Sequence, residues 1–311
     1  MIIFIAATVL SYVWNSTGTT VATVINPSAL ALDSSGALYV VESSQNRVQK
    51  YIIGMSNSTT VAGQASAVSG STSDFLHAPT DIAIDSSNNV YVVDKENNRV
   101  QLWASGASNG TTVAGIGGAG TAANQLNYPY NMARDSSTGT LYISDNGNNR
   151  VMKYLSGGSS GTVVAGGNGY GTGGNQLISP SGIYFDSSSN SLVIANYLGH
   201  NIVRWVLGAS NWTLIAGSTT GTAGSSSTML DHPTGLTLDS MGNIYVADTV
   251  NNRIQFFLAG QSNGTTIAGI NGAAGSSAIQ LSAPTAVILD SQLNIYVADT
   301  GNNRVLKFSH S

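Results

Sequence analysis

Short runs of apolar residues recur along the chain with the same polar turn between them. The clearest copy, residues 244–254, reads IYVADTVNNRI: one apolar run ends at Asp248, and Arg253 opens the next. Four more copies stand at residues 38–48, 90–100, 141–151 and 295–305, and a degenerate copy, LVIANYLGHNI, stands at 192–202. Apolar runs of this length, bounded by turn residues, predict β-strands.

Six prolines divide the chain into units of about fifty residues: Pro27, Pro79, Pro129, Pro180, Pro233 and Pro284. After each proline comes a strand with apolar side chains two apart, which closes on an aspartate. The two runs around the polar turn supply a second and a third strand, and a fourth ends in Ala-Gly. Proline suits the first residue of a strand because it has no N–H to give to the ladder.

Four antiparallel strands repeated six times predict an all-β fold, a six-bladed β-propeller with four-stranded blades. The last unit stops after its third strand, whereas an unattached strand sequence, residues 19–23, precedes the first proline. We expect this N-terminal strand to complete the last blade, because closure removes an exposed sheet edge. The predicted domains are an apolar leader or signal-like segment at 1–18 and the propeller at 19–311.

Residues 1–14 are uncharged and almost wholly apolar. They resemble the apolar region of a secretory signal, although the basic residues that usually precede it are missing. The segment is short for a transmembrane span. The alternative is a strand or leader fragment that packs on the domain.

The low charge of the chain narrows the choice of partners. Charged residues make up 8% of the sequence and the net charge is −4, which argues against nucleic acid or an anionic membrane as a partner. The absence of cysteine excludes disulfides and thiolate metal sites. We expect a monomer with no membrane span.

The unit P-x-x-[LIVM]-x-x-D followed by [LIV]-Y-V-x-D-x-x-N-x-R-[IV] resembles the NHL repeat over roughly residues 19–308. The resemblance implies a propeller fold. It does not imply one function, because similar repeats occur in RNA-binding tripartite-motif proteins, bacterial sensor domains, the peptide-amidating lyase and scaffolds.

The repeated acid and arginine stand at the two ends of the polar turn, where charge-assisted hydrogen bonds would clamp it. The degenerate unit loses both partners together, to Asn196 and Asn201. Joint retention and joint loss predict structural pairs. The predicted pairs are Glu42–Arg47, Asp94–Arg99, Asp145–Arg150, Asp248–Arg253 and Asp299–Arg304.

Ligand binding on a repeated scaffold is expected where the copies differ. Residues just past each proline should lie near the mouth of the central channel, and Arg134 replaces an apolar residue of the other units. A charge there is costly unless it is paired, hydrated or bound to a ligand. The predicted ligand-binding residues, placed together on one loop face, are Asp81, Tyr130, Asn131, Arg134 and His232.

These features favour a non-enzymatic propeller that binds a peptide, protein or glycan through its loop face, without cofactor, metal or catalytic residue. The alternative is a metal-dependent hydrolase or lyase at the channel mouth that uses His77 or His232, since convergent histidines bind zinc. Resemblance to the amidating lyase would imply histidine directly after several prolines, and this chain has Ser, Thr or Tyr there. A third option is a purely structural module of a larger chain.

The turn between the third and fourth strands carries the N-glycosylation acceptor pattern at Asn57, Asn109, Asn211 and Asn263. The alternative is that Asn-Gly is simply a favoured hairpin turn. Together with the apolar N-terminus, the pattern favours an extracellular or cell-surface location.

Overall fold

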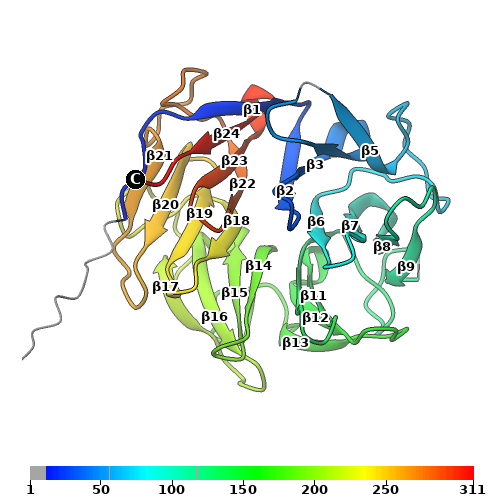
Figure 1. Ribbon diagram of the computed structural model, residues 1–311. Coiled ribbons are helices and arrows are strands. Elements are labelled where there is room, and N and C mark those ends of the chain that lie inside the picture. The colour runs from blue at the N-terminus through cyan, green and yellow to red at the C-terminus, as the bar shows by residue number, and fades with distance from the viewer. Residues whose placement is uncertain (1–11, 56, 117) are drawn as a thin grey trace, which may run out of the picture.

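The computed structural model describes residues 12–55, 57–116 and 118–311. Over these residues, six four-stranded antiparallel sheets surround a central axis (Figure 1). The first strand of each unit lies innermost and contacts the first strands of both neighbouring units. The prediction of a six-bladed β-propeller is therefore confirmed.

The strands of each blade follow from the inner to the outer edge of the sheet. Blades 1 to 3 are β2 Pro27–Leu32, β3 Leu38–Glu42, β4 Arg47–Tyr51, β5 Ser58–Gly63; β6 Asp81–Ile84, β7 Val90–Asp94, β8 Arg99–Trp103, β9 Thr111–Ala114; β10 Pro129–Arg134, β11 Leu141–Asp145, β12 Arg150–Tyr154, β13 Thr162–Gly166. Blades 4 to 6 are β14 Pro180–Asp186, β15 Ser191–Asn196, β16 Asn201–Val206, β17 Thr213–Gly217; β18 Pro233–Leu238, β19 Ile244–Asp248, β20 Arg253–Phe257, β21 Thr265–Gly269; β22 Pro284–Leu289, β23 Ile295–Asp299, β24 Arg304–Phe308, β1 Thr19–Thr23.

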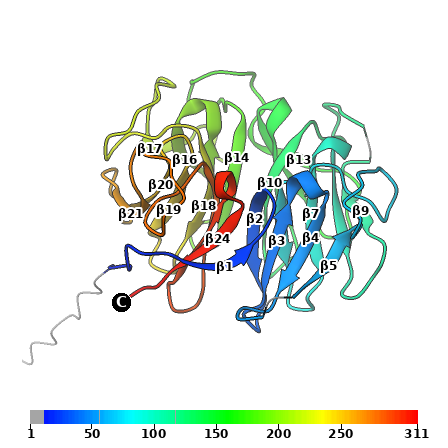
Figure 2. The ribbon, with the colours of Figure 1, turned by 90° about the horizontal axis from the view of Figure 1, so that it is seen from above.

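The N-terminal strand closes the ring. β1 pairs antiparallel with β24, with Thr19 opposite Lys307 and Thr23 opposite Arg304 (Figure 2). Just before β1, Trp14 is buried against Phe256, and its indole N–H donates to the carbonyl oxygen of Leu293 at 2.8 Å. The packed propeller thus includes part of the segment predicted as a leader, whose residues 1–11 lie outside the described residues. Among the described residues no helix is long and apolar enough to cross a membrane.

Apolar side chains fill the space between neighbouring blades. One cluster joins Tyr39 and Val41 of blade 1 to Val92 and Trp103 of blade 2, and it also includes Leu76 from the connecting loop. The same loop position holds a fully buried leucine before five of the prolines: Leu76, Leu126, Leu177, Leu230 and Leu281. Because burying a leucine contributes roughly 1.5–3 kcal/mol, each of these leucines anchors its long loop to the blades.

The polar turn between the second and third strands ends in a left-handed residue. In the register of blade 2, Asp94 lies opposite Arg99 across this turn. The six left-handed residues have φ between 51° and 55°. His200 takes this position in blade 4, and the other five are asparagines: Asn46, Asn98, Asn149, Asn252 and Asn303. Asparagine tolerates this conformation better than other side chains.

The turn acid, the turn asparagine and the arginine form a buried hydrogen-bond hub. In blade 2, Oδ2 of Asp94 accepts hydrogen bonds from Nε of Arg99 at 2.7 Å and from Nδ2 of Asn97 at 2.8 Å. Its Oδ1 accepts the backbone N–H of His77. The remaining guanidinium nitrogens donate to three carbonyl oxygens of the loop that leads into the blade: Ser71, Thr72 and Phe75. The hub therefore fixes the long mouth loop as well as the turn.

Blade 4 replaces the charged hub with amides. Oδ1 of Asn196 accepts the backbone N–H of Ile178 at 2.6 Å, the place that a carboxylate oxygen takes elsewhere. Nδ2 of Asn201 donates to the carbonyl oxygen of Ser218. The pair is neutral, so this turn holds no buried charge that needs a partner.

Replacing Arg253 by asparagine should destabilise the propeller by about 3–5 kcal/mol, because it leaves the fully buried carboxylate of Asp248 without its cation. The double variant D248N/R253N copies blade 4. We expect it to lose less free energy of unfolding than the sum of the two single variants, measured by denaturant unfolding as a double-mutant cycle. R47N is the control: Arg47 is more exposed, so its loss should cost less. Strictly additive losses would contradict a coupled pair.

Candidate binding site at the channel mouth

Two sets of side chains meet at the mouth of the central channel. The inner strands begin there at or just after their prolines, and the second strands end there at the turn acid or, in blade 4, at Asn196, as the pairing of Pro233 with Asp248 illustrates. The residue after the proline and the residue after the acid therefore lie close together. Between them is a cavity of about 340 Å³ whose lining includes Lys95, Tyr130, Ser181, Tyr197, Thr234 and Thr249.

Most hydroxyl groups of this lining already join neighbouring blades. Oγ of Ser181 donates to the carbonyl oxygen of Pro233 at 3.0 Å, and Oγ1 of Thr249 donates to that of Pro284 at 2.8 Å. Thr234 and Thr285 make equivalent bonds to the next blade. These hydroxyls stabilise the ring, and their hydrogen atoms are not available to a ligand.

The lining contributed by blades 2, 3 and 4 is different. Here the lining includes Lys95, Tyr130 and Tyr197, each partly exposed, beside Asn146, whose Nδ2 donates to the carbonyl oxygen of Pro180. Burial, then the neighbouring Tyr197 and Asp81, raise the pKa of Tyr130 to about 12, so its hydroxyl stays protonated. Nζ of Lys95 lies 3.4 Å from a carboxylate oxygen of Glu96 and 5.6 Å from the ring centre of Tyr128. One side of the mouth thus presents two phenols and a cation.

Asp81 and Asn131 lie in the channel wall and make equivalent bonds. Oδ2 of Asp81 accepts the backbone N–H of Met132 at 2.8 Å, and Oδ1 of Asn131 accepts that of Ile183 at 2.9 Å. Both bonds tie one inner strand to the next. Burial raises the pKa of Asp81 to about 7, although its backbone hydrogen bonds act in the opposite direction.

Arg134 does not lie with the other predicted ligand-binding residues. It ends β10, the strand that begins at the mouth with Pro129, so it lies at the opposite end of the channel. Its guanidinium carbon lies 5.2 Å from the ring centre of Tyr91. The prediction of one shared face is wrong for this residue, because alternation along the strand specifies which way a side chain points but not how far along the axis it lies.

His232 belongs to a cluster that borders the mouth. Its Nδ1 lies 2.6 Å from Oδ1 of Asp231, and its ring packs edge-on against Tyr197, with 4.6 Å between ring centres. His200, which the sequence did not single out, lies on the other side of it, and burial lowers the pKa of His200 so that the ring favours the neutral form. His77 is exposed and precedes blade 2, so it is not part of this cluster.

The four acceptor asparagines, Asn57, Asn109, Asn211 and Asn263, are exposed. In blade 2 the β8–β9 connection follows Trp103, which pairs with Val90 at the start of β7. Because β7 ends at the mouth, this connection lies at the opposite end of the blade. The acceptor turns therefore face away from the channel mouth.

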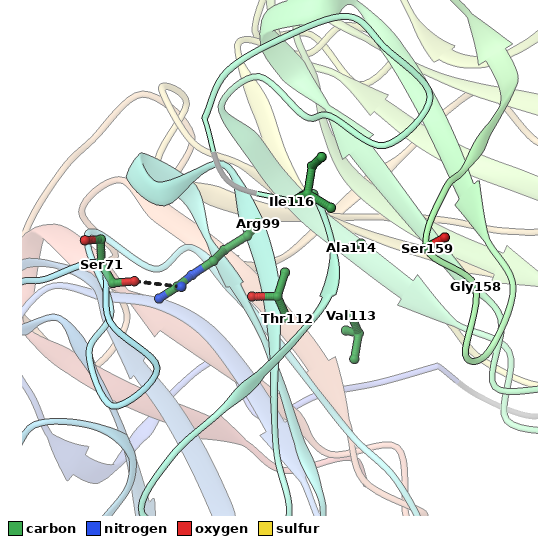
Figure 3. Close-up of a pocket in the computed structure, with 9 residues that line it drawn as sticks. Ser71, Arg99, Thr112, Val113, Ala114, Ile116, Gly158 and Ser159 are labelled. Carbon is green, nitrogen blue, oxygen red and sulfur yellow. Dashed lines mark hydrogen bonds between the residues drawn. The ribbon is translucent and has the colours of Figure 1, made fainter.

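A second cavity, of about 490 Å³, lies at the outer edge of blades 2 and 3 (Figure 3). Arg99 is its ionic side chain, and the guanidinium donates to the carbonyl oxygen of Ser71 as part of the hub. The rest of its lining is small or apolar, such as Val113, Ile116 and Gly158. Although this cavity is larger, its ionic side chain is engaged in the hub, whereas the mouth cavity is lined by the rings of Tyr130 and Tyr197 and by Lys95.

The NHL repeat model matches the chain at residues 76–102, 230–257 and 281–308, which belong to blades 2, 5 and 6. Three of the six units therefore match the NHL repeat, and the described residues form a closed six-bladed β-propeller. No curated protein matches it in sequence.

Solved structures of similar shape include both binding proteins and enzymes. An auxiliary nutrient binding protein from Bacteroides ovatus is 14% identical, with a TM-score of 0.66 over 96% of this chain and 73% of that one. A gluconolactonase from Xanthomonas campestris is 12% identical, with a TM-score of 0.67 over 94% and 89%. Virginiamycin B lyase from Staphylococcus aureus is 13% identical, with a TM-score of 0.59 over 97% and 100%. At these identities the likeness establishes the fold alone.

Replacing Asp81 by asparagine should stabilise the protein in a pH-dependent way. The folded state raises the pKa of Asp81 from 3.8 to about 7, so the native protein binds this proton more tightly than the unfolded chain does. Stability is therefore lost as the pH rises from 3.8 to about 7, and D81N escapes that loss. We expect D81N to exceed the wild type by up to about 4 kcal/mol at pH 8 and to approach it near pH 4, measured by denaturant unfolding.

The reverse change at the equivalent position is the matched control. N131D places a carboxylate where the amide now accepts the N–H of Ile183, so it should destabilise the protein at pH 8 more than at pH 4. A stability difference between D81N and the wild type that does not change with pH would contradict the raised pKa of Asp81.

Proposed function

We propose that this propeller is a non-enzymatic binding module that takes a polar segment of a glycan, peptide or protein at the channel mouth. The observation that carries the proposal is the one-sided lining of the mouth. Lys95, Tyr130 and Tyr197 face the cavity from blades 2 to 4, whereas the hydroxyls of blades 4 to 6 are engaged in the ring.

Among these ligands, a glycan suits the chemistry best. Tyrosine rings offer a flat apolar face with a polar edge, which matches the alternating C–H and O–H groups of a sugar. The ammonium group of Lys95 suits a carboxylate-bearing sugar. The likeness to auxiliary nutrient binding proteins of Bacteroides supports a binding role.

A second candidate function is a metal-dependent hydrolase or lyase with its site at the channel mouth. The specific observation in its favour is the cluster of His200, Asp231 and His232 behind Tyr197. The gluconolactonase and the lyase among the structural neighbours also support it. Turnover of lactone or ester substrates that stops on chelation would favour this candidate over simple binding.

We also propose an extracellular or cell-surface location with glycans on the acceptor asparagines. Glycans on the face opposite the mouth would leave the binding cavity open. Produced through a eukaryotic secretory pathway, the protein should migrate faster after treatment with an amidase that removes N-glycans. N109Q should reduce that shift by one glycan, whereas N131Q, outside an acceptor pattern, should leave it unchanged. Secreted protein that shows no shift would contradict the glycosylation proposal.

Binding should be detectable on arrays of neutral and acidic glycans, with a peptide array as the comparison. We expect Y197A and K95A each to weaken binding by about tenfold or more, because aromatic and charged anchors contribute on the order of 1.4 kcal/mol or more each. Loss of a preference for acidic sugars in K95A would identify the contact made by the ammonium group.

The matched control is Y170A, since Tyr170 is exposed and lies outside the mouth cavity. This variant should bind like the wild type. Binding that Y197A and K95A leave intact would place the ligand elsewhere on the propeller and would contradict the proposal.

A further inference from the structure

The seam between blades 4 and 5 differs from the other seams of the described ring. Elsewhere the left-handed turn residue is an asparagine, and its Oδ1 accepts the backbone N–H of the residue before the next proline. These bonds join Asn46 to Ala78, Asn98 to Tyr128, Asn149 to Ser179, Asn252 to Ala283 and Asn303 to Asn26. At the blade 4–5 seam, Nδ1 of His200 accepts the N–H of His232 at 3.1 Å. An asparagine would make this bond equally well.

The two positions before the proline vary from seam to seam, and at this seam both carry a side chain that can bind a metal. The residues before the proline here are Asp231 and His232, where the equivalent seam before blade 6 has Ser282 and Ala283. Two of the four histidines in the chain are thereby placed next to one carboxylate. The seam itself needs none of these three side chains, and His200 replaces an asparagine that the other five seams share.

The three side chains form a compact set of nitrogen and oxygen donors. Oδ1 of Asp231 lies 2.6 Å from Nδ1 of His232 and 3.5 Å from Nδ1 of His200. The two imidazole rings are 4.4 Å apart and nearly perpendicular, at 84°. His200 is buried, whereas 21% of the Asp231 side chain and 28% of the His232 side chain are exposed, which leaves a route from solvent.

We propose that His200, Asp231 and His232 bind a divalent metal ion of the zinc class. Imidazole nitrogens and a carboxylate oxygen are preferred zinc ligands, and three protein ligands leave a coordination position for water or a bound molecule. Tetrahedral zinc at bond lengths of about 2.1 Å holds its ligands about 3.4 Å apart. The distance between Oδ1 of Asp231 and Nδ1 of His232 has to increase by less than an ångström. The hydrogen bond from the backbone N–H of His232 to Nδ1 of His200 is exchanged for a bond from that nitrogen to the metal.

The surroundings suit a cation at this position. Blade 4 carries Asn196 and Asn201 where the other blades have an acid and an arginine, so no guanidinium of its own turn competes with a metal. Tyr197 packs against His232 and also lines the mouth cavity. The metal site therefore borders the proposed ligand cavity, but the inference does not depend on a ligand binding there.

The test is titration of the metal-free, untagged full chain with Zn²⁺ by calorimetry, and with Co²⁺ by visible absorption. We expect one site, and an absorption band of tetrahedral Co²⁺ that Zn²⁺ removes. The decisive variant is H200N, which copies the other seams and keeps an acceptor for the N–H of His232. It should weaken Zn²⁺ binding by more than about 100-fold, beyond the loss typical of outer-shell partners, while its melting temperature without metal stays close to that of the wild type.

D231S copies the seam before blade 6 and should weaken binding similarly, whereas H77A removes an exposed histidine outside the cluster and should bind like the wild type. Zn²⁺ should also raise the melting temperature of the wild type and of H77A but not that of H200N. Absence of binding by the wild type at millimolar Zn²⁺, or equal affinity in H200N and the wild type, would overturn the proposal.

Discussion

The buried carboxylate of each polar turn is the interaction on which most of the propeller depends. A desolvated carboxylate needs several hydrogen bonds and a cation, and Asp248 obtains them from Asn251, Arg253 and the backbone N–H of Asp231. Since the guanidinium of Arg253 also holds carbonyl oxygens of the preceding loop, one ionic group fixes a turn, a strand end and a long loop together. The loops at the mouth are therefore held in place before any ligand arrives.

Blade 4 lacks the charged hub and has two asparagines in its place. With Asn196 and Asn201 in place of the ion pair, the turn has no buried charge to satisfy, and the residues between these asparagines differ from those of the other copies. Those residues include Tyr197 and His200, which supply an aromatic side of the mouth and a donor of the proposed metal site. The degenerate copy therefore combines a neutral turn with side chains that suit recognition. The charged hub does not prevent such side chains, since Lys95 follows the hub acid Asp94 in blade 2.

The ring of blades was predictable from the sequence because the proline and the spacing between acid and arginine recur from unit to unit. A strand that is hard to assign in one unit can therefore be assigned from its equivalents in the others. The mouth was only partly predictable. Tyr130 follows a proline and could be placed. Lys95 and Tyr197 instead follow the last residue of the second strand, Asp94 or Asn196, and only the folded turn directs them to the axis. His200 occurs in one copy, without a pattern to mark it, although its departure from asparagine was a usable signal.

The position of the candidate site follows from how a ring of blades satisfies its own polar groups. Where serine or threonine follows a proline, as at Thr285, the hydroxyl can donate to the next blade, and the blades are tied together. Blade 3 has the long phenol of Tyr130 at this position, which lines the cavity, and its tie to blade 4 comes instead from Nδ2 of Asn146, which donates to the carbonyl oxygen of Pro180 at 3.1 Å. Recognition groups therefore gather where a long side chain replaces a short hydroxyl that would donate to the next blade. Blades 2 to 4 carry these groups, and because the ring continues through blades 4 to 6, the mouth can be chemically one-sided without opening the propeller.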